Sequence, residues 1–143
     1  LIIMPVAIAA VIYSLVANKP HTFWAFSVAI IAMLAIIGLK HFIHRQRPNT
    51  LYVKNMLFKS YSFPSWHAFS SIVTYGLLAY LASTHLSFWI AYPIVIILMF
   101  LTILIGISRV YFGAHYPTDV IGGWILGVLV LSAIIWTTWL RIY

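Results

Sequence analysis

The chain contains a single acidic residue, Asp119, and His115 lies four positions before it. A lone carboxylate among apolar segments is costly to bury and is usually functional. A carboxylate bonded to one imidazole nitrogen fixes the tautomer of the ring and leaves the other nitrogen able to attack an electrophile. If Pro117 opens a helix, the same two residues also fit a simpler interpretation, an Asp favoured at a helix N-terminus beside an interfacial His. Both interpretations stay open on this pair alone.

Basic residues in two other places have the chemistry to bind phosphate. Arg109 precedes His115 by six positions, and a guanidinium presents a planar fork of donors that matches phosphate oxygens. Lys40 and Arg47 are seven positions apart, nearly two helical turns, so they share a face if the helix continues to Pro48. Arg109 as a snorkelling cation and Lys40 as a helix-end anchor are the alternatives.

The run Pro64-Ser65-Trp66-His67 opens an apolar segment. A helix N-terminus offers unbonded N–H groups and the positive end of the helix dipole, which together favour an anion. Ser65 can cap this helix or bond an oxyanion, and His67 in the first turn can donate a proton. The alternative is a capped helix with an interfacial His.

The composition indicates what must position these residues. Of 143 residues, 64% are hydrophobic and only 6% are charged, whereas about 25% is usual for a soluble domain. The surface must therefore face an apolar solvent, and a lipid bilayer is that solvent. The net charge of +7 comes from basic residues placed between apolar runs, which favours phosphate head groups over nucleic acid as partners. The absence of cysteine excludes disulfides and cysteine metal sites.

Five apolar segments are long enough to be membrane helices, because about 17–25 residues cross the hydrocarbon core. We therefore predict an all-α bundle of five transmembrane helices in one domain over residues 1–143. The two longer connections, 44–64 and 108–117, then lie on the same membrane face, so that their residues can meet. The apolar segments are 1–17, 23–43, 65–83, 88–107 and 118–140.

The distribution of basic residues does not decide the orientation in the membrane. Those on the side of the longer connections are Lys40, Arg45, Arg47, Lys54, Lys59 and Arg109, and those on the other side are Lys19 and Arg141. Counted together they place the longer connections in the cytoplasm. If Lys40, Arg47 and Arg109 serve chemistry, they do not count toward the orientation. Three basic residues then remain on the side of the longer connections against two on the other side, which does not decide the orientation.

Two further segments have structural interpretations. Gly123 and Gly127 form a pair of small residues one helical turn apart, which permits close helix approach; packing inside the bundle is favoured over homodimerisation. Segment 51–63 mixes aromatic and apolar residues with Lys54 and Lys59. It fits either an interfacial segment at the lipid head groups or an ordinary loop.

Taken together, Lys-x6-Arg-Pro, Pro-Ser-x-His and Ser-Arg-x5-His-x3-Asp occur in this order and on one predicted membrane face. The set, which runs from Lys40 to Asp119, resembles the type-2 phosphatidic acid phosphatase superfamily, membrane lipid phosphate phosphatases related to vanadium haloperoxidases. Members are typically six-helix membrane proteins, so the resemblance implies that this chain corresponds to helices two to six. It also implies a site on the extracytoplasmic side.

The resemblance implies a role for each matching residue. His115 is the nucleophile that forms a phosphohistidine, Asp119 orients it, and His67 protonates the leaving alkoxide. The family's second motif normally has glycine where this chain has Trp66, whose backbone N–H can still face the phosphate and whose indole can shape lipid selectivity. The residues expected to hold the phosphate are Lys40, Arg47, Ser65, Trp66 and Arg109.

The sequence thus predicts a phosphatase for a lipid phosphate or diphosphate, with undecaprenyl diphosphate, phosphatidylglycerol phosphate and phosphatidic acid as candidate substrates. A catalytic magnesium normally requires carboxylates, and only Asp119 exists, so we expect no metal and no other cofactor. A zinc site from His41 and His44 is conceivable, but interfacial histidines are favoured. The alternatives are a lipid-linked phosphotransferase and a catalytically weakened lipid-binding or transport relative, for which Trp66 is the argument. A bacterial plasma membrane is the expected location, and the oligomeric state is open.

Overall fold

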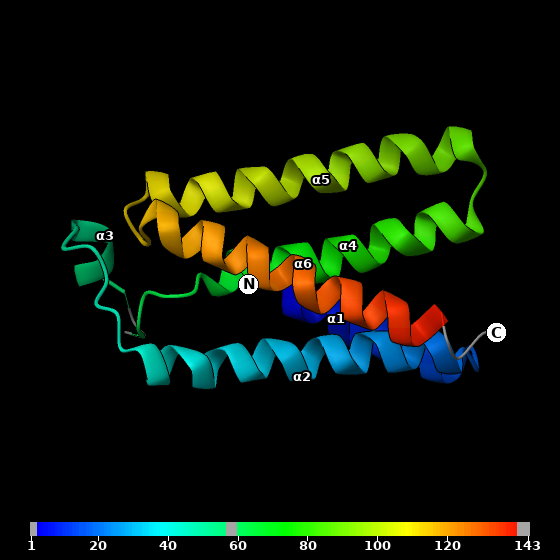
Figure 1. Ribbon diagram of the computed structural model, residues 1–143. Helices are drawn as coiled ribbons and strands as arrows, with labels where there is room; N and C mark the ends of the chain where they lie inside the picture. The colour runs from blue at the N-terminus through cyan, green and yellow to red at the C-terminus, as the bar shows by residue number, and fades with distance from the viewer. Residues whose placement is uncertain (1–2, 57–59, 140–143) are drawn as a thin grey trace.

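The computed structural model describes residues 3–56 and 60–139, and within them every regular element is a helix. Of these helices, four have 20 or more residues. These long helices run along the length of the molecule, with α1 beside them (Figure 1). In that view α2 and α5 lie on opposite sides, with α4 and α6 between them. The helices are α1 (Ile3–Val16), α2 (Pro20–Ile43), α3 (Leu51–Lys54), α4 (Trp66–His85), α5 (Phe88–Tyr111) and α6 (Pro117–Trp139).

Three of these helices, α2, α5 and α6, are long and apolar enough to cross a membrane, and α1 is apolar but shorter. The all-α prediction is confirmed, and the five predicted segments correspond to α1, α2, α4, α5 and α6. α4 has 20 residues but is less apolar, because it carries Ser70, Ser71 and Thr74. These three polar side chains are fully buried within the bundle, so α4 presents little of its polar surface to lipid.

The position of α4 explains this composition. Among the described residues, α4 contacts α1 and the other three long helices, whereas α5 contacts only α4 and α6. The apolar core lies mainly where α4 faces α2, with Phe26 and Met33 packed against Phe69, Val73 and Leu77. The start of α4, which carries Ser65 and His67, is therefore held by packing along the whole helix rather than by its loop alone.

Close contact between α4 and α6 depends on two glycines. A Cβ on Gly123 would lie 2.7 Å from the Ser65 carbonyl oxygen, and a Cβ on Gly127 would lie 2.8 Å from the Ile72 Cβ. Both positions face α4 within the same chain. The interpretation of this glycine pair as packing inside the bundle is therefore confirmed.

The second helix ends with the predicted segment 23–43 and does not continue to Pro48, so the condition under which Lys40 and Arg47 would share a helix face is not met. α2 ends at Ile43, and His44 adopts a left-handed conformation with φ 56° while its N–H donates to the Lys40 carbonyl at 3.1 Å. A left-handed residue at this position ends a helix by satisfying its last carbonyl groups. Lys40 is thus the last polar residue of the buried helix face, and Arg47 lies on the irregular segment that follows.

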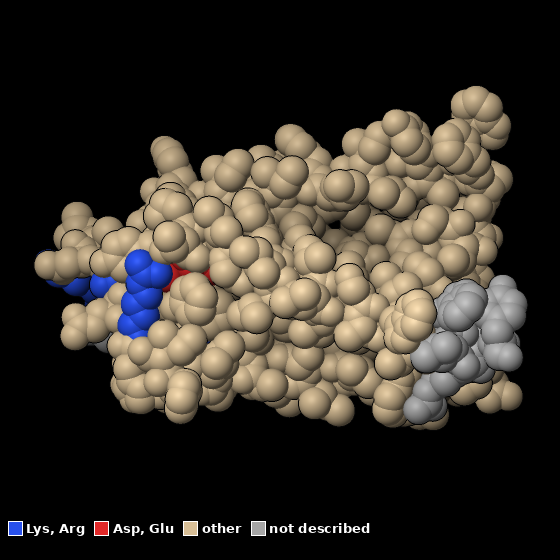
Figure 2. Space-filling view, in the orientation of Figure 1, with Lys and Arg blue, Asp and Glu red and all other residues tan. Residues whose placement is uncertain are grey.

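The 51–63 segment contains the short helix α3, capped by Thr50, whose side chain accepts a hydrogen bond from the Val53 N–H. Leu51 and Tyr52 are exposed. Of the residues used in the sequence predictions, Leu57, Phe58, Lys59 and Arg141 lie outside the described residues. On the visible face of the molecule the Lys and Arg side chains gather at one end (Figure 2).

We predict that Gly123→Ala destabilises the protein by about 1–3 kcal/mol, since the new methyl group meets backbone atoms that cannot move aside. Gly38→Ala is the matched control, because a Cβ there has no neighbour within 4 Å. It should be neutral or stabilising by up to about 1 kcal/mol, as alanine favours helix. Thermal unfolding of both variants in detergent measures the difference, and equal melting temperatures would contradict the packing account.

Candidate active site

The three sequence motifs meet at one end of the bundle, where α2 ends and where α4 and α6 begin (Figure 1). Hydrogen bonds join the segments that carry them. The Ser65 N–H donates to the Asp119 carbonyl at 2.9 Å, and the Thr50 hydroxyl donates to the Gly113 carbonyl at 3.1 Å. The two longer connections, far apart in sequence, therefore form one structure.

Asp119 lies at the centre of this structure and is fully buried. Its Oδ1 accepts from the Arg45 guanidinium at 2.7 Å. Its Oδ2 accepts from the Ser62 hydroxyl and from the Tyr116 N–H, the latter at 2.8 Å. A buried carboxylate is stable only with such partners, and here they come from the segment after α2, the segment before α4 and the residue just before α6.

His115 lies between Asp119 and Arg47 and is only 4% exposed. Its Nδ1 is 3.5 Å from the Asp119 Oδ2, and its Nε2 is 3.4 Å from the Arg47 Nη1. A guanidinium has donors only, so the nitrogen facing Arg47 must offer a lone pair. The geometry therefore assigns the proton to Nδ1, on the side of Asp119, and the lone pair to Nε2.

The charge state of His115 follows from its surroundings. Burial lowers the pKa of the imidazole below its ordinary value near 6.5, and the positive charges of Arg47 and Lys40 act in the same direction, whereas Asp119 opposes them. The ring is therefore neutral at pH 7. A neutral imidazole with a lone pair on Nε2 is a nucleophile or a base.

Lys40 and Arg47 are both held by backbone oxygen atoms of the segment before α4. The buried Lys40 ammonium donates to the Tyr61 carbonyl at 2.9 Å, and the Arg47 Nε donates to the Ser60 carbonyl at 2.7 Å. Arg47 also donates to the Ala114 carbonyl at 3.0 Å. Carbonyl groups orient these cations without cancelling their charge, so the site keeps a positive field.

The start of α4 is built as the sequence predicts, since Ser65 is its N-cap and the Ser65 Oγ accepts from the Ala68 N–H at 3.4 Å. The Trp66 indole extends toward the bundle interior and donates to the Met33 carbonyl at 3.2 Å. The Trp66 ring also meets the half-buried His67 ring edge-on, with 5.4 Å between centroids. Trp66 thus packs beneath His67 against α2.

Arg109 lies in the last turn of α5, and its Nε donates to the Ser108 hydroxyl at 3.1 Å. Its carbonyl accepts from the Ala114 and His115 N–H groups, at 3.0 and 3.2 Å, which fixes the loop that presents His115. His67 lies in the first turn of α4, at the same end of the bundle. The structure therefore brings all eight residues predicted from the sequence to one end of the bundle.

Sequence reasoning missed Arg45 and Ser62. Arg45 pairs with Asp119, donates to the Thr118 hydroxyl at 2.8 Å and stacks on the Tyr116 ring at 4.6 Å. A signal was present, because the only carboxylate of a membrane bundle needs a cation and Arg45 lies between Lys40 and Arg47. Ser62 gave no such signal, since nothing in its sequence neighbourhood separates it from an ordinary loop serine.

His41 and His44, considered as zinc ligands, both lie against the Tyr61 ring, with centroid distances of 5.5 and 4.5 Å. In this arrangement they pack the end of α2 onto the segment before α4.

The structure is an apolar helical bundle with a buried His–Asp pair and oriented cations at one end. The chain belongs to the PAP2 superfamily, which it matches over residues 21–143. It is 30% identical to the crystal structure of a transmembrane PAP2-type phosphatidylglycerolphosphate phosphatase from Bacillus subtilis. That likeness has a TM-score of 0.74 and covers 93% of this chain and 65% of the other. The chain is therefore an integral membrane protein.

Two curated relatives carry names that describe lipid phosphatases. The chain is 40% identical over 93 residues to phosphatidylglycerophosphatase B of Bacillus subtilis (strain 168), covering 64% of this chain and 45% of that protein. It is 42% identical over 67 residues to undecaprenyl-diphosphatase of Sulfolobus acidocaldarius, covering 47% of this chain and 29% of that protein. The chain thus spans less than half the length of the curated relatives it matches.

We predict that Arg45→Ala lowers the free energy of unfolding by about 1–3 kcal/mol, because it leaves a buried carboxylate short of a partner. Lys54→Ala, which removes an exposed cation from α3, is the control and should have no effect. In an Asp119→Asn background the cost of Arg45→Ala should shrink, since no charge is left unpaired. Chemical or thermal unfolding in detergent gives the free energies of unfolding of the wild type, the two single variants and the double variant. If Arg45→Ala costs as much in the Asp119→Asn background as in the wild type, the ion pair is contradicted.

Proposed function

We propose that this protein hydrolyses phosphate monoesters or diphosphates of membrane lipids through a phosphohistidine on His115. The observation that supports the proposal most is the orientation of His115, with the protonated Nδ1 toward Asp119 and the lone pair of Nε2 toward Arg47. The named activities of the relatives, on phosphatidylglycerophosphate and undecaprenyl diphosphate, provide independent support.

The first step begins with phosphate displacing Arg47 from the His115 lone pair. A phosphate oxygen accepts the Arg47 N–H more strongly than an imidazole does, because the bond is charge-assisted on both sides. Nε2 then attacks phosphorus while the bond from phosphorus to the lipid oxygen breaks. Asp119 stabilises the positive charge that develops on the ring.

His67 delivers a proton to the departing lipid oxygen, so that a lipid alcohol leaves rather than an alkoxide. From a diphosphate, the leaving group is the lipid monophosphate. In the second step His67 takes a proton from water as the water oxygen attacks phosphorus. The phosphorus–Nε2 bond breaks, inorganic phosphate departs, and both histidines return to their starting state.

The remaining site residues hold the phosphate oxygens. Lys40, Arg47 and Arg109 supply positive charge, and the first turn of α4 supplies N–H groups at Trp66 and His67 together with the Ser65 hydroxyl. The Trp66 indole bonds to α2 and does not fill the space above the first turn of α4. Its position supports a catalytic site rather than a catalytically weakened site that only binds lipid. We place the site on the extracytoplasmic face of a bacterial plasma membrane.

Hydrolysis should need no metal, since the only carboxylate is fully occupied by protein donors. We expect the purified protein in detergent to release inorganic phosphate from phosphatidic acid, phosphatidylglycerol phosphate or undecaprenyl diphosphate at the same rate with and without EDTA. Loss of activity in EDTA that magnesium or zinc restores would refute metal independence. Transfer of the phosphoryl group to an acceptor without phosphate release would instead indicate a phosphotransferase.

His67→Ala should lose about 10²- to 10⁴-fold in kcat on lipid alkyl phosphates and much less on p-nitrophenyl phosphate, because the phenolate leaves without a proton. His115→Ala should fail on both substrates, which makes it the control. Steady-state kinetics on the two substrates measure the ratio. Equal losses of His67→Ala on both would remove His67 from the role of acid.

The acidic limb of kcat/KM should lie below pH 6.5, since burial lowers the pKa of His115 and the free base is the form that attacks. Activity should therefore be retained as the pH falls from 7 to 6.5 and lost at lower pH. Asp119→Asn should move the limb further down, because the carboxylate raises the pKa of His115. The profile is corrected for the titration of the substrate, and a limb above pH 6.5 would contradict the assignment.

A further inference from the structure

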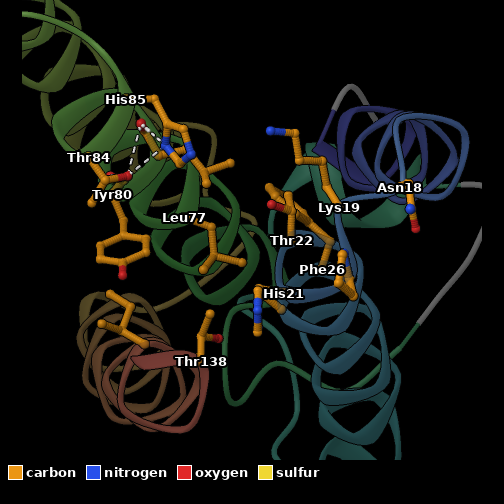
Figure 3. A pocket seen from close by; sticks show the side chains of 14 residues that line it. Asn18, Lys19, His21, Thr22, Phe26, Leu77, Tyr80, Thr84, His85 and Thr138 are labelled. Atoms are coloured by element: carbon orange, nitrogen blue, oxygen red, sulfur yellow. Dashed lines mark hydrogen bonds between the residues drawn. The ribbon is translucent and has the colours of Figure 1, made fainter. Parts of the chain in front are cut away.

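A cavity of about 590 Å³ lies at the end of the bundle opposite Asp119. It is formed where α2 begins and where α4 and α6 end (Figure 3). Its volume is in the range of about 300–1,000 Å³ that holds small ligands. None of the residues assigned to phosphate chemistry lines it, so it is a separate feature of the molecule.

The mouth of this cavity is basic. Lys19, His21 and His85 all line it, and Lys19 and His85 extend from facing walls (Figure 3). Neither the Lys19 ammonium nor the His21 ring makes a hydrogen bond or ion pair with the described residues. The His85 Nδ1 lies 2.8 Å from the Thr84 Oγ1 and 3.1 Å from the Leu81 carbonyl oxygen, which leaves Nε2 for a ligand.

The chain has no acidic side chain at this mouth. Its only carboxylate, Asp119, lies at the other end of α6 and is bonded to Arg45. In this respect Lys19 differs from Lys40, whose ammonium is held by two backbone carbonyl groups. Lys19 is exposed and is not paired by any side chain of the described residues, so its charge is available to attract an anion at the membrane surface.

The floor of the cavity is apolar. Ala25 and Phe26 of α2, Leu77 and Leu81 of α4 and Ile135 of α6 line it, below the basic mouth. A free inorganic anion would contact the mouth and leave this apolar floor unfilled. A molecule with an anionic head and an apolar body would satisfy both parts.

We propose that this cavity binds an anionic phospholipid from the leaflet opposite the site of Asp119, with the headgroup phosphate at Lys19 and His21 and the start of an acyl chain on the apolar floor. The end of the bundle at which it lies is where such headgroups are found, and phosphate there is attracted by juxtamembrane basic residues. This lipid is a bound component of the protein and not its substrate, so the proposal is independent of hydrolysis.

Native mass spectrometry of the protein in neutral detergent tests the proposal by counting bound lipid. Phosphatidylserine, an anionic phosphodiester, should be retained in preference to zwitterionic phosphatidylcholine. The double variant Lys19→Ala/His21→Ala should weaken phosphatidylserine binding roughly tenfold or more, since each basic residue at a membrane surface contributes attraction. Lys54→Ala, an exposed lysine at the other end, is the matched control and should bind as the wild type does.

Two further variants locate the lipid. Leu81→Trp fills the floor and keeps every basic group, so it should also reduce retention; unchanged retention, or full displacement by millimolar inorganic phosphate, would indicate a free-anion site and overturn the proposal. Arg47→Ala should retain the lipid. Loss of phosphatidylserine in Arg47→Ala but not in the Lys19→Ala/His21→Ala variant would assign the lipid to the site of His115 and would equally overturn the proposal.

Discussion

The structure depends on one buried carboxylate that a membrane protein can keep only if it is fully satisfied. Asp119 bonds Arg45, Ser62 and the Tyr116 N–H, and its own backbone carbonyl accepts from Ser65. These partners come from the segment after α2, the segment before α4 and the residue just before α6. Satisfying the carboxylate therefore brings together the ends of three helices that the membrane alone would leave as separate rods.

The scarcity of acidic residues also determines the electrostatics of the site. With eight Lys and Arg residues and one acid, most cations have no carboxylate to pair with. Lys40 and Arg47 are oriented by backbone carbonyl oxygens instead, which position a guanidinium or an ammonium but leave its charge in place. The result is a positively charged end with a neutral His115, the arrangement that the proposed binding of phosphate requires.

Much of the fold follows from hydropathy, because each apolar segment in a bilayer must satisfy its backbone as a helix. The motif residues could likewise be placed on one membrane face by counting crossings. The predicted segment 23–43 ends where α2 ends, but the left-handed conformation of His44 could not be predicted, since it is neither glycine nor asparagine. The partners of Asp119 were missed because Arg45 and Ser62 act through loop geometry, which periodicity does not encode. The Trp66 indole points toward Met33 and away from the site. This direction likewise could not be predicted without knowing how α4 packs on α2.

The central claim is that the Nε2 of His115 forms a covalent bond to phosphorus. Rapid-quench labelling with a ³²P-labelled lipid phosphate, followed by peptide mapping, tests it most directly. The account predicts an acid-labile, base-stable phosphoryl label on the peptide that contains His115 in the wild-type protein and no label in His115→Ala. A label of wild-type intensity in His115→Ala, or one mapped to the peptide of His67, would contradict the account.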